Sequence, residues 1–262
     1  MITVLTATYN RATTLPRLFE SLCAQTCMEF EWLIVDDGSL DDTQSILTGF
    51  ASSAPFKIRI VEQLNSGKHV ALNSGAAHVS TPWLFIVDSD DALVPKAIAT
   101  ILSSIDQPSD EGTVGLCYRK AYFDMQLLGV KLNVGDMPII LTPTGAGHLF
   151  KGDLAYVFKT EMLIRHKFPV FPGEKFVPEL YVWNKIGDEG LIYFFPNEIL
   201  YLCDYLDDGY SRNFSSNLRK NPKGFLVFYW SQIGREISIF FKAKYLIRSI
   251  QCYLYTLLNR FS

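Results

Sequence analysis

The chain has 262 residues, of which 48% are hydrophobic and 19% charged, and its formal net charge is −3. This length and composition fit one large globular domain with an extension, and they exclude disordered, collagen-like and coiled-coil chains. The acidic excess argues against a general nucleic-acid-binding protein, which needs a basic surface. Five scattered cysteines are typical of reduced thiols and not of a disulfide framework.

The charge is divided unevenly along the chain. Residues 211–262, the basic tail, carry nine Lys and Arg and one acid, a net charge of +8. Residues 1–210, the acidic body, carry 15 bases and 26 acids, a net charge of −11. Met1 leads directly into an apolar segment, so we expect no signal peptide, and no uncharged stretch is apolar enough to predict a membrane span.

Short apolar runs alternate with amphipathic segments over the first hundred residues. Strands are predicted at Ile2–Thr8, Trp32–Asp36, Lys57–Glu62 and Trp83–Asp88, and helices near Leu15–Gln25, Asp42–Ala51, Lys68–Val79 and Pro95–Ile105. This alternation predicts an α/β fold with a Rossmann-like, mostly parallel sheet that is covered by helices on both faces.

The pattern changes in the second half of the chain. Residues 122–157 are interrupted by Gly and Pro and predict no clear element before a helix resumes near residue 159. The predicted elements are strands at Val114–Ala121 and Tyr193–Tyr205, and helices at Lys159–His166, Glu179–Ile186, Phe225–Phe241 and Ala243–Arg260.

Polar residues cluster where each of the first four predicted strands ends. The clusters are Thr8-Tyr9-Asn10-Arg11, Asp36-Asp37-Gly38-Ser39, Asn65-Ser66-Gly67-Lys68 and Asp88-Ser89-Asp90-Asp91. Because the carboxyl ends of parallel strands lie at one edge of a sheet, where such proteins bind ligands, we expect the four clusters to lie together.

The cluster after the fourth strand holds three acids within four residues, Asp88, Asp90 and Asp91. Crowded like charges cost free energy unless a cation offsets them. Carboxylates are the hard oxygen ligands that suit Mn²⁺ or Mg²⁺, with phosphate oxygens and water completing the shell. The alternative is a solvated loop in which Asp91 caps the next helix.

The other clusters carry groups that suit a nucleotide. Asp37 can accept the N–H of a base such as uracil or a ribose hydroxyl, Tyr9 offers a ring for stacking, and Lys68 begins a predicted helix, a position suited to phosphate. A tight turn at Asp37 and strand-end packing of Tyr9 are the alternatives. Neither a P-loop nor a dinucleotide-binding fingerprint is present, which argues against NTPases and nicotinamide dehydrogenases.

Four segments together resemble the glycosyltransferase family 2 domain, which has the GT-A fold. In order along the chain they are Thr6-Ala-Thr-Tyr-Asn-Arg11, Val35-Asp-Asp-Gly-Ser39, Asn65-Ser-Gly-Lys68 and Asp88-Ser-Asp-Asp91. The resemblance is strong over residues 1–105. Downstream, Gly173-Glu-Lys-Phe-Val-Pro-Glu179 and Asp208-Gly-Tyr-Ser211 are similar to members that build bacterial surface polysaccharides.

The resemblance implies a role for individual positions. Asp90 would hold a Mn²⁺ or Mg²⁺ ion that bridges the donor's diphosphate, and Asp88 would assist the metal or contact the ribose. The residues expected to bind the nucleotide-sugar donor are Thr8, Tyr9, Arg11, Asp37, Lys68, Asp88 and Ser89.

The resemblance also implies a carboxylate as catalytic base. In the family this base enters a helix, usually as the Asp of a Glu-Asp pair, and this chain has no such pair near residue 179. Glu179 begins a predicted helix as the family base does, so we prefer it to Glu174. A helix N-terminal charge without catalytic function is the alternative for either residue.

The implied function is an inverting, metal-dependent transfer of a hexosyl or N-acetylhexosaminyl group from a nucleotide-diphosphate donor, expected to be a UDP-sugar. The acceptor is expected to be a glycan or lipid-linked hydroxyl in cell-surface polysaccharide synthesis. Residues 1–105 would be the nucleotide-binding half and residues 106–210 the acceptor and catalytic half. The alternatives are a nucleotidyltransferase that makes the activated sugar, a glycosidase, and an inactive sugar-nucleotide-binding subunit.

The basic tail interleaves bases with apolar residues at helical spacing, with Lys242, Lys244 and Arg248 among Phe240, Leu246 and Ile250. This pattern predicts an amphipathic helix on anionic lipid and therefore a cytoplasmic protein that is peripheral on the inner face of the cell membrane. The alternative is a helix packed on the acidic body or in a homodimer interface.

Overall fold

The structure, a computed structural model, describes residues 1–106, 112–204 and 214–259. Its N-terminal half alternates strands and helices as the sequence predicts, with ends that differ by up to two residues, and it adds one short strand at Ala92–Leu93 that the sequence did not predict. The elements are β1 (Ile2–Thr8), α1 (Leu15–Cys23), β2 (Phe30–Asp36), α2 (Thr43–Ser53), β3 (Lys57–Glu62), α3 (Lys68–His78), β4 (Trp83–Ile86), β5 (Ala92–Leu93) and α4 (Ala97–Asp106).

The second half of the acidic body contains elements that the sequence did not predict. These are β7, α5 and β8, which all lie in or overlap the stretch interrupted by Gly and Pro. The elements are β6 (Thr113–Ala121), β7 (Ile139–Ile140), α5 (Pro143–Phe150), β8 (Leu154–Lys159), α6 (Thr160–Arg165), α7 (Leu180–Gly187) and β9 (Leu191–Leu202). Tyr205, the predicted end of the last strand, lies outside the described residues.

In the described part of the chain, the strands form one mixed sheet in the order β3-β2-β1-β4-β8-β6-β9-β5, with β7 paired to β9. The predicted α/β sheet flanked by helices is confirmed. Parallel pairing holds for β3-β2-β1-β4 and for β6 with β9, whereas β8 is antiparallel to β4 and β6, and β9 is antiparallel to β5 and β7. The sheet is therefore mostly parallel only in its N-terminal half. The sequence did not predict the antiparallel strands, because the apolar pattern of a strand does not encode its direction.

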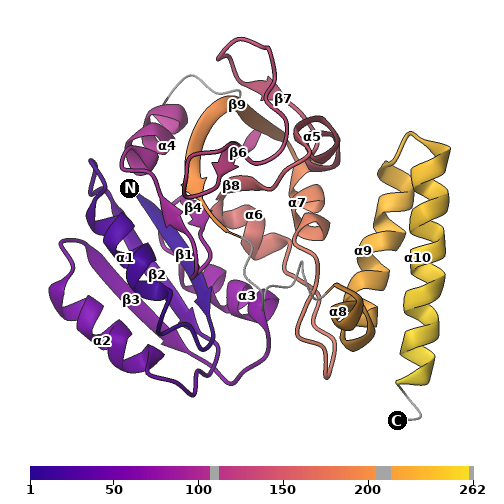
Figure 1. Ribbon diagram of the computed structural model, residues 1–262, viewed down its shortest axis with the longest axis horizontal. Coiled ribbons are helices and arrows are strands. Elements are labelled where there is room, and N and C mark those ends of the chain that lie inside the picture. The colour runs from indigo at the N-terminus through magenta and orange to yellow at the C-terminus, as the bar shows by residue number, and fades with distance from the viewer. Residues whose placement is uncertain (107–111, 205–213, 260–262) are drawn as a thin grey trace.

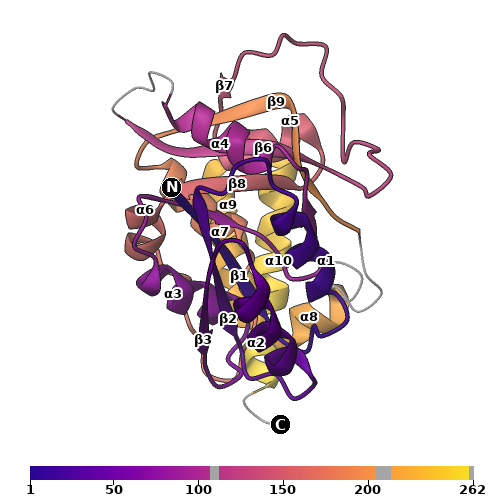
Figure 2. The same ribbon diagram turned by 90° about the vertical axis from the view of Figure 1, so that its left-hand side faces the viewer.

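Both faces of the N-terminal strands are buried, because successive side chains point to opposite sides of a sheet. Val4 of β1 packs in a cluster with Leu18 of α1, and the neighbouring Leu5 packs in a second cluster with Leu72 of α3. As a result, α1, α2 and α4 cover one face of the sheet, and α3, α5, α6 and α7 cover the other (Figures 1 and 2).

Three C-terminal helices stand beside the sheet, with α9 and α10 forming a hairpin and α10 outermost (Figure 1). They are α8 (Phe214–Lys220), α9 (Pro222–Arg235) and α10 (Ile239–Leu258). The break between the two long helices was predicted near residue 242 and lies instead at residues 236–238. Glu236 is buried there, and its carboxylate lies 2.9 Å from His148 Nε2 of α5, a tertiary contact that the local pattern does not reveal. Arg260 and the predicted boundary at residue 210 lie outside the described residues.

None of the helices in the described ranges has the length and apolar character that crossing a membrane requires.

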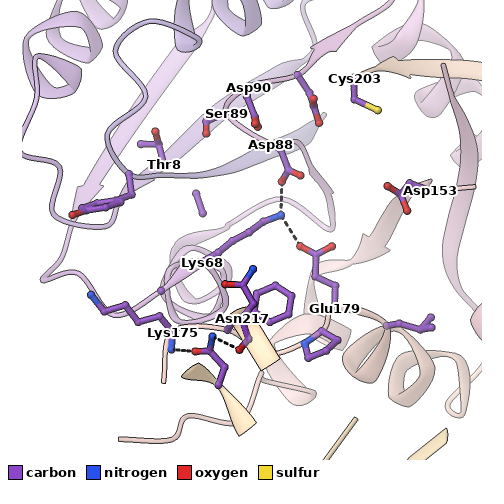
Figure 3. A pocket seen from close by; sticks show the side chains of 18 of the residues that line it. Thr8, Lys68, Asp88, Ser89, Asp90, Asp153, Lys175, Glu179, Cys203 and Asn217 are labelled. Atoms are coloured by element: carbon purple, nitrogen blue, oxygen red, sulfur yellow. Dashed lines mark hydrogen bonds and ion pairs between the residues drawn. The ribbon is translucent and has the colours of Figure 1, made fainter. Parts of the chain in front are cut away.

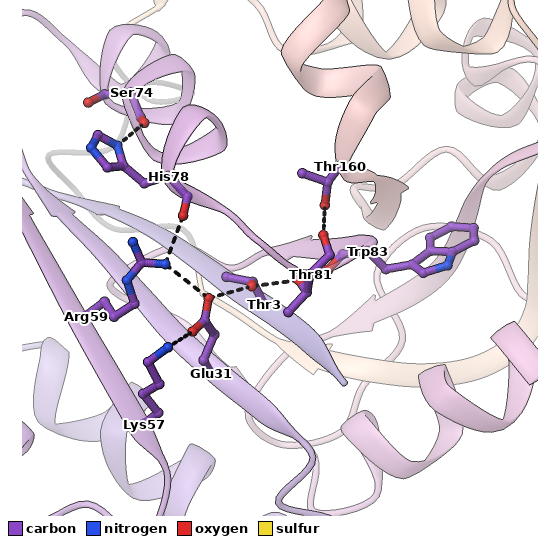
Figure 4. A network of polar contacts seen from close by, with 9 residues as sticks. All are labelled: Thr3, Glu31, Lys57, Arg59, Ser74, His78, Thr81, Trp83 and Thr160. Atoms are coloured by element: carbon purple, nitrogen blue, oxygen red, sulfur yellow. Dashed lines mark hydrogen bonds and ion pairs between the residues drawn. The ribbon is translucent and has the colours of Figure 1, made fainter.

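A buried polar network closes the amino-terminal edge of the sheet (Figure 4). Glu31 of β2, with a side chain 1% exposed, accepts a hydrogen bond from Thr3 Oγ1 at 3.1 Å and lies 2.9 Å from Lys57 Nζ. Arg59 lies 3.5 Å from the same carboxylate and donates to the carbonyl of His78 at 2.9 Å. Burial opposes the charge on Glu31, but the hydrogen bonds from Lys57 and Thr3 and the nearby cations outweigh it and hold the pKa of Glu31 below its ordinary value.

Replacing Glu31 with Gln is expected to lower the free energy of unfolding by about 1–3 kcal/mol at neutral pH, because two cations lose a buried anionic partner. A lowered folded-state pKa means that ionised Glu31 contributes stability above the unfolded pKa and that this contribution is lost as pH falls through the folded pKa. Denaturant unfolding should therefore show the two proteins converging below about pH 4. A difference that stays constant from neutral pH to that range would contradict the assignment.

Candidate active site

A cavity of about 1180 Å³ opens at the carboxyl ends of β1 to β4, where the four polar clusters meet. The residues predicted from sequence that line it are Thr8, Tyr9, Arg11, Asp37, Lys68, Asp88, Ser89, Asp90 and Glu179. Glu174 is not among the lining residues. The far wall comes from the second half of the chain and includes residues that the sequence did not single out: Lys120, Asp153, Trp183, Asn217 and Lys220.

Lys68 joins the two carboxylates that face each other across this cavity. Its Nζ lies 2.6 Å from Asp88 Oδ1 and 2.8 Å from Glu179 Oε1 (Figure 3). Burial alone would lower the pKa of Lys68, but the charges of Asp88 and Glu179 outweigh it and raise that pKa well above the usual value. Lys68 is therefore a positive charge held between the acidic loop that follows β4 and the start of α7.

The acidic loop after β4 carries charges that its surroundings only partly offset. Burial would raise the pKa of Asp88, but the charges of Lys68 and Lys120 dominate and hold it below the ordinary value. Burial and the charge of Asp88 raise the pKa of Asp90. For Asp91, burial raises the pKa to about 7. The loop is thus an electrostatically costly arrangement that an additional cation would stabilise.

Three residues from distant parts of the chain hold the acidic loop in place. Tyr201 of β9 accepts the N–H of Asp88 at its hydroxyl, at 2.8 Å, and its side chain also hydrogen-bonds Asp91. Lys120 of β6 lies 3.8 Å above the Tyr201 ring. The guanidinium of Arg17 in α1 donates to the Asp90 carbonyl. Sequence reasoning missed all three, because each lies in an ordinary strand or helix without a local motif.

The carboxylate oxygens of the acidic loop are the kind of ligand that a hard divalent cation prefers. Asp88, Ser89, Asp90 and Asp91 all line the cavity, and after burial the charge of Asp88 is the next cause of the raised pKa of Asp90. Within the described residues, no group of three or more His, Cys, Asp or Glu side chains is arranged to hold a metal alone. An ion at Asp88 and Asp90 would therefore need oxygen ligands from a bound phosphate and water, as Mg²⁺ and Mn²⁺ commonly have.

Asp37 holds the loop that precedes Lys68 in place through hydrogen bonds. Its carboxylate accepts the N–H of Ser66 at 2.8 Å, the N–H of Gly67 at 2.7 Å and the side-chain amide of Gln63 at 2.7 Å. A carboxylate has about four acceptor sites, so Asp37 keeps capacity for one more donor, such as a base N–H. Tyr9 is partly exposed at the cavity edge nearby.

The segment from Gly173 to Pro178 lies directly against the loop that precedes Lys68. Gly67 has φ +98°, and a Cβ there would lie 2.2 Å from the carbonyl oxygen of Lys175, so only glycine allows this backbone approach. The Lys175 ammonium also contacts the side-chain oxygen of Asn65. These contacts fix the segment that leads into Glu179.

The two candidate bases have different surroundings. Glu179 is the residue before α7, and its carboxylate makes no capping hydrogen bond but faces Lys68 in the cavity. Glu174 is 8% exposed, and its carboxylate accepts the N–H groups of Lys223 at 3.0 Å and Gly224 at 2.9 Å, in the first turn of α9. Glu179 therefore faces the cavity, whereas Glu174 holds the first turn of α9. The Asp208–Ser211 motif lies outside the described residues.

Comparison with known sequences identifies a matching family and several relatives. The sequence model of a family described as Glycosyl transferase family 2 matches residues 3–145. An uncharacterized glycosyltransferase of Nostoc sp. is 30% identical over 179 residues, which is 65% of this chain and 54% of that protein. A PGL/p-HBAD biosynthesis glycosyltransferase of Mycobacterium bovis is 33% identical over 113 residues, 42% of this chain and 44% of that protein. The chain thus spans about half the length of these curated relatives.

Solved structures share the fold at low sequence identity. A TarS fragment from S. aureus in complex with UDP-GlcNAc aligns with a TM-score of 0.71 at 17% identity, over 95% of this chain and 72% of that chain. The mannosyltransferase PcManGT from Pyrobaculum calidifontis, in complex with GDP-Man and Mn²⁺, aligns with a TM-score of 0.60 at 19% identity, over 97% of this chain and 70% of that chain.

Replacing Glu174 with Ala is expected to lower the free energy of unfolding by about 1–3 kcal/mol, because two backbone N–H groups of α9 lose their buried acceptor. Glu198→Ala, at an exposed position of β9, is the matched control and should change stability by less than about 0.5 kcal/mol. Thermal or denaturant unfolding measures both variants. Equal stability of the two variants would show that Glu174 does not anchor α9.

Proposed function

The chain belongs to glycosyl transferase family 2, and we propose that it transfers a sugar from a nucleotide-diphosphate donor to an acceptor hydroxyl with inversion of the anomeric centre. The observation that carries this proposal is the placement of Glu179 opposite the acidic loop in one cavity, with Lys68 between Glu179 and Asp88. A base for the acceptor and a cluster for the donor's phosphates then face the same space.

The donor side of the proposal uses the clusters at the carboxyl edge of the sheet. Asp37 and Thr8 would border the base, with Tyr9 at its edge. The diphosphate would be a third anionic partner of Lys68, in addition to Asp88 and Glu179. The structural neighbours are complexes with UDP-GlcNAc and with GDP-Man, which supports a nucleotide sugar as donor, and we propose a UDP-sugar.

Asp90, with Asp88, would hold Mn²⁺ or Mg²⁺. When bound, the ion would supply positive charge for the leaving diphosphate. The proposal rests on the carboxylate chemistry of the loop and on the crowding of three acids within four residues, and one structural neighbour is a complex with Mn²⁺.

The acceptor side of the proposal uses Glu179 as general base. Glu179 takes the proton of the acceptor hydroxyl while that oxygen forms a bond to the anomeric carbon. The bond from the anomeric carbon to the diphosphate oxygen breaks in the same displacement, and the electron pair leaves with the nucleoside diphosphate. Lys68 supports this step because its ammonium, 2.8 Å from Glu179 Oε1, fixes the direction in which the carboxylate points.

We place the acceptor among glycans or lipid-linked oligosaccharides of cell-surface polysaccharide synthesis, and the reaction at the inner face of the cell membrane. The supporting observations are the resemblance of residues 173–179 to surface-polysaccharide members and the basic, apolar C-terminal helices.

A screen of nucleotide sugars with and without Mn²⁺ or Mg²⁺ tests the proposal. The expected result is thermal stabilisation and slow hydrolysis of one UDP-sugar that both require the metal. Stabilisation without turnover, in the presence of candidate acceptors, would instead favour an inactive binding subunit. Formation of a nucleotide sugar from a sugar phosphate and an NTP would favour a nucleotidyltransferase.

Replacing Glu179 with Gln is expected to lower kcat by about 10²–10⁴-fold and to leave the dissociation constant of the donor nearly unchanged, because the base acts on the acceptor. Steady-state kinetics and donor titration measure the two effects. Glu189→Gln, on the surface away from the cavity, is the control and should leave kcat unchanged. A Glu179→Gln enzyme with full kcat would exclude this base.

Replacing Asp90 with Asn is expected to lower the metal-dependent rate by about 10²–10³-fold, by analogy with the loss of other transition-state electrostatic contacts. The half-saturating concentration of Mn²⁺ should rise in the same variant. Asp124→Asn, outside the cavity, is the control. Unchanged metal dependence in Asp90→Asn would remove Asp90 from the metal site.

A further inference from the structure

The outer face of α10 carries large apolar side chains along the whole helix. Six of them, all between 44% and 71% exposed, recur at spacings of three, four and seven residues and so lie on one side: Phe240, Leu246, Ile247, Ile250, Leu254 and Leu258. We call this surface the outer face of α10. A helix of 20 residues is about 30 Å long. The outer face of α10 is therefore a long apolar stripe, unlike the single exposed apolar residues that are normal on protein surfaces.

The opposite side of α10 fixes the direction of this face. Cys252 is buried in a cluster with Leu218 of α8 and with Phe225 and Tyr229 of α9, and the Tyr245 ring stacks on Tyr229 with centroids 5.8 Å apart. Figure 1 shows α10 as the outermost element, with α9 between it and the sheet. Packing on the body therefore accounts for only one side of the helix.

The charges of α10 distinguish the candidate occupants of the outer face. The helix contains Lys242, Lys244 and Arg248 and no Asp or Glu. At 100° per residue, Lys242 and Lys244 flank the apolar stripe on its two sides. A second copy of α10 would bring bases and no acids, so it offers no complementary charge, whereas an anionic bilayer offers both complementary charge and an apolar layer beneath it.

We propose that the outer face of α10 docks on the surface of an anionic bilayer, with the helix axis in the membrane plane. This inference deepens the proposed function, since it names the surface that would bring the enzyme to a lipid-linked acceptor. The link to the cavity is α8, which contributes Asn217 and Lys220 to the cavity wall and is tied to the end of α10 by the side chain of Asn259, which donates to the Arg219 carbonyl at 2.9 Å.

Vesicle sedimentation of the full chain tests the docking directly. The probes are vesicles of phosphatidylcholine with about 30 mol% phosphatidylglycerol, and vesicles of phosphatidylcholine alone. We expect at least about tenfold stronger partitioning to the anionic vesicles, weakened by high salt and by the double change Lys242→Gln/Lys244→Gln. Equal partitioning to the two vesicles would overturn the electrostatic part of the proposal.

The apolar part is tested with Ile247→Glu/Ile250→Glu, at positions 66% and 53% exposed, where substitution should leave the fold intact. This variant should lose at least about tenfold in partitioning, because two apolar side chains that would enter the bilayer become charges of the same sign as its lipids. Ile164→Glu on α6, at a position 42% exposed, is the matched control and should sediment like the wild type. Thermal unfolding of all variants verifies that they remain folded.

Two further outcomes overturn the proposal. One is wild-type partitioning by Ile247→Glu/Ile250→Glu. The other is a wild-type dimer in light scattering that this variant converts to monomer without any vesicle binding by the wild type, which would assign the outer face to a second copy. Sedimentation needs no donor, metal or acceptor, so its failure leaves the proposed transfer reaction standing, and failure of donor turnover leaves the sedimentation result intact.

Discussion

The gathering of carboxylates at one edge of a sheet is the constraint on which the rest of this structure depends. Asp88, Asp90 and Asp91 follow one strand within four residues, and Glu179, the residue before α7, lines the same cavity. Charges of this kind are costly away from water unless cations offset them. Lys68 contacts both Asp88 and Glu179, and the charge of Lys120 also acts on Asp88. Burial and the neighbouring carboxylates raise the pKa values of Asp90 and Asp91, so a bound cation would stabilise their ionised forms.

The second half of the chain completes the cavity by close backbone contact. Gly67 allows the carbonyl of Lys175 to approach the loop that precedes α3. Glu174 accepts the N–H groups of Lys223 and Gly224 in the first turn of α9. Segment 173–178 is therefore fixed on one side by the loop that precedes α3 and on the other by the first turn of α9. Glu179 follows this segment directly, so the position of the proposed base depends on contacts with both.

Much of the fold and of the cavity could be predicted from the sequence, because the signals involved are local. Short apolar runs and helical spacing predicted β1 to β4 and α1 to α4, and the parallel order placed the polar residues that follow these strands at one edge. The roles assigned to Asp37, Lys68, Asp90 and Glu179 came from a resemblance and remain proposals. Tyr201 and Lys120 could not be found in this way, since each lies in a strand whose pattern resembles that of any buried strand.

The sequence by itself determined the α/β class, the family resemblance, the acidic strand ends and the contrast between an acidic body and a basic tail, because all of these are written in local composition and spacing. The tertiary structure alone decided that Glu174 anchors α9, that the break before α10 falls beside His148, and that one side of α10 stays exposed. The physical reason is that a carboxylate's role and a helix's buried side depend on which distant groups the fold brings against them.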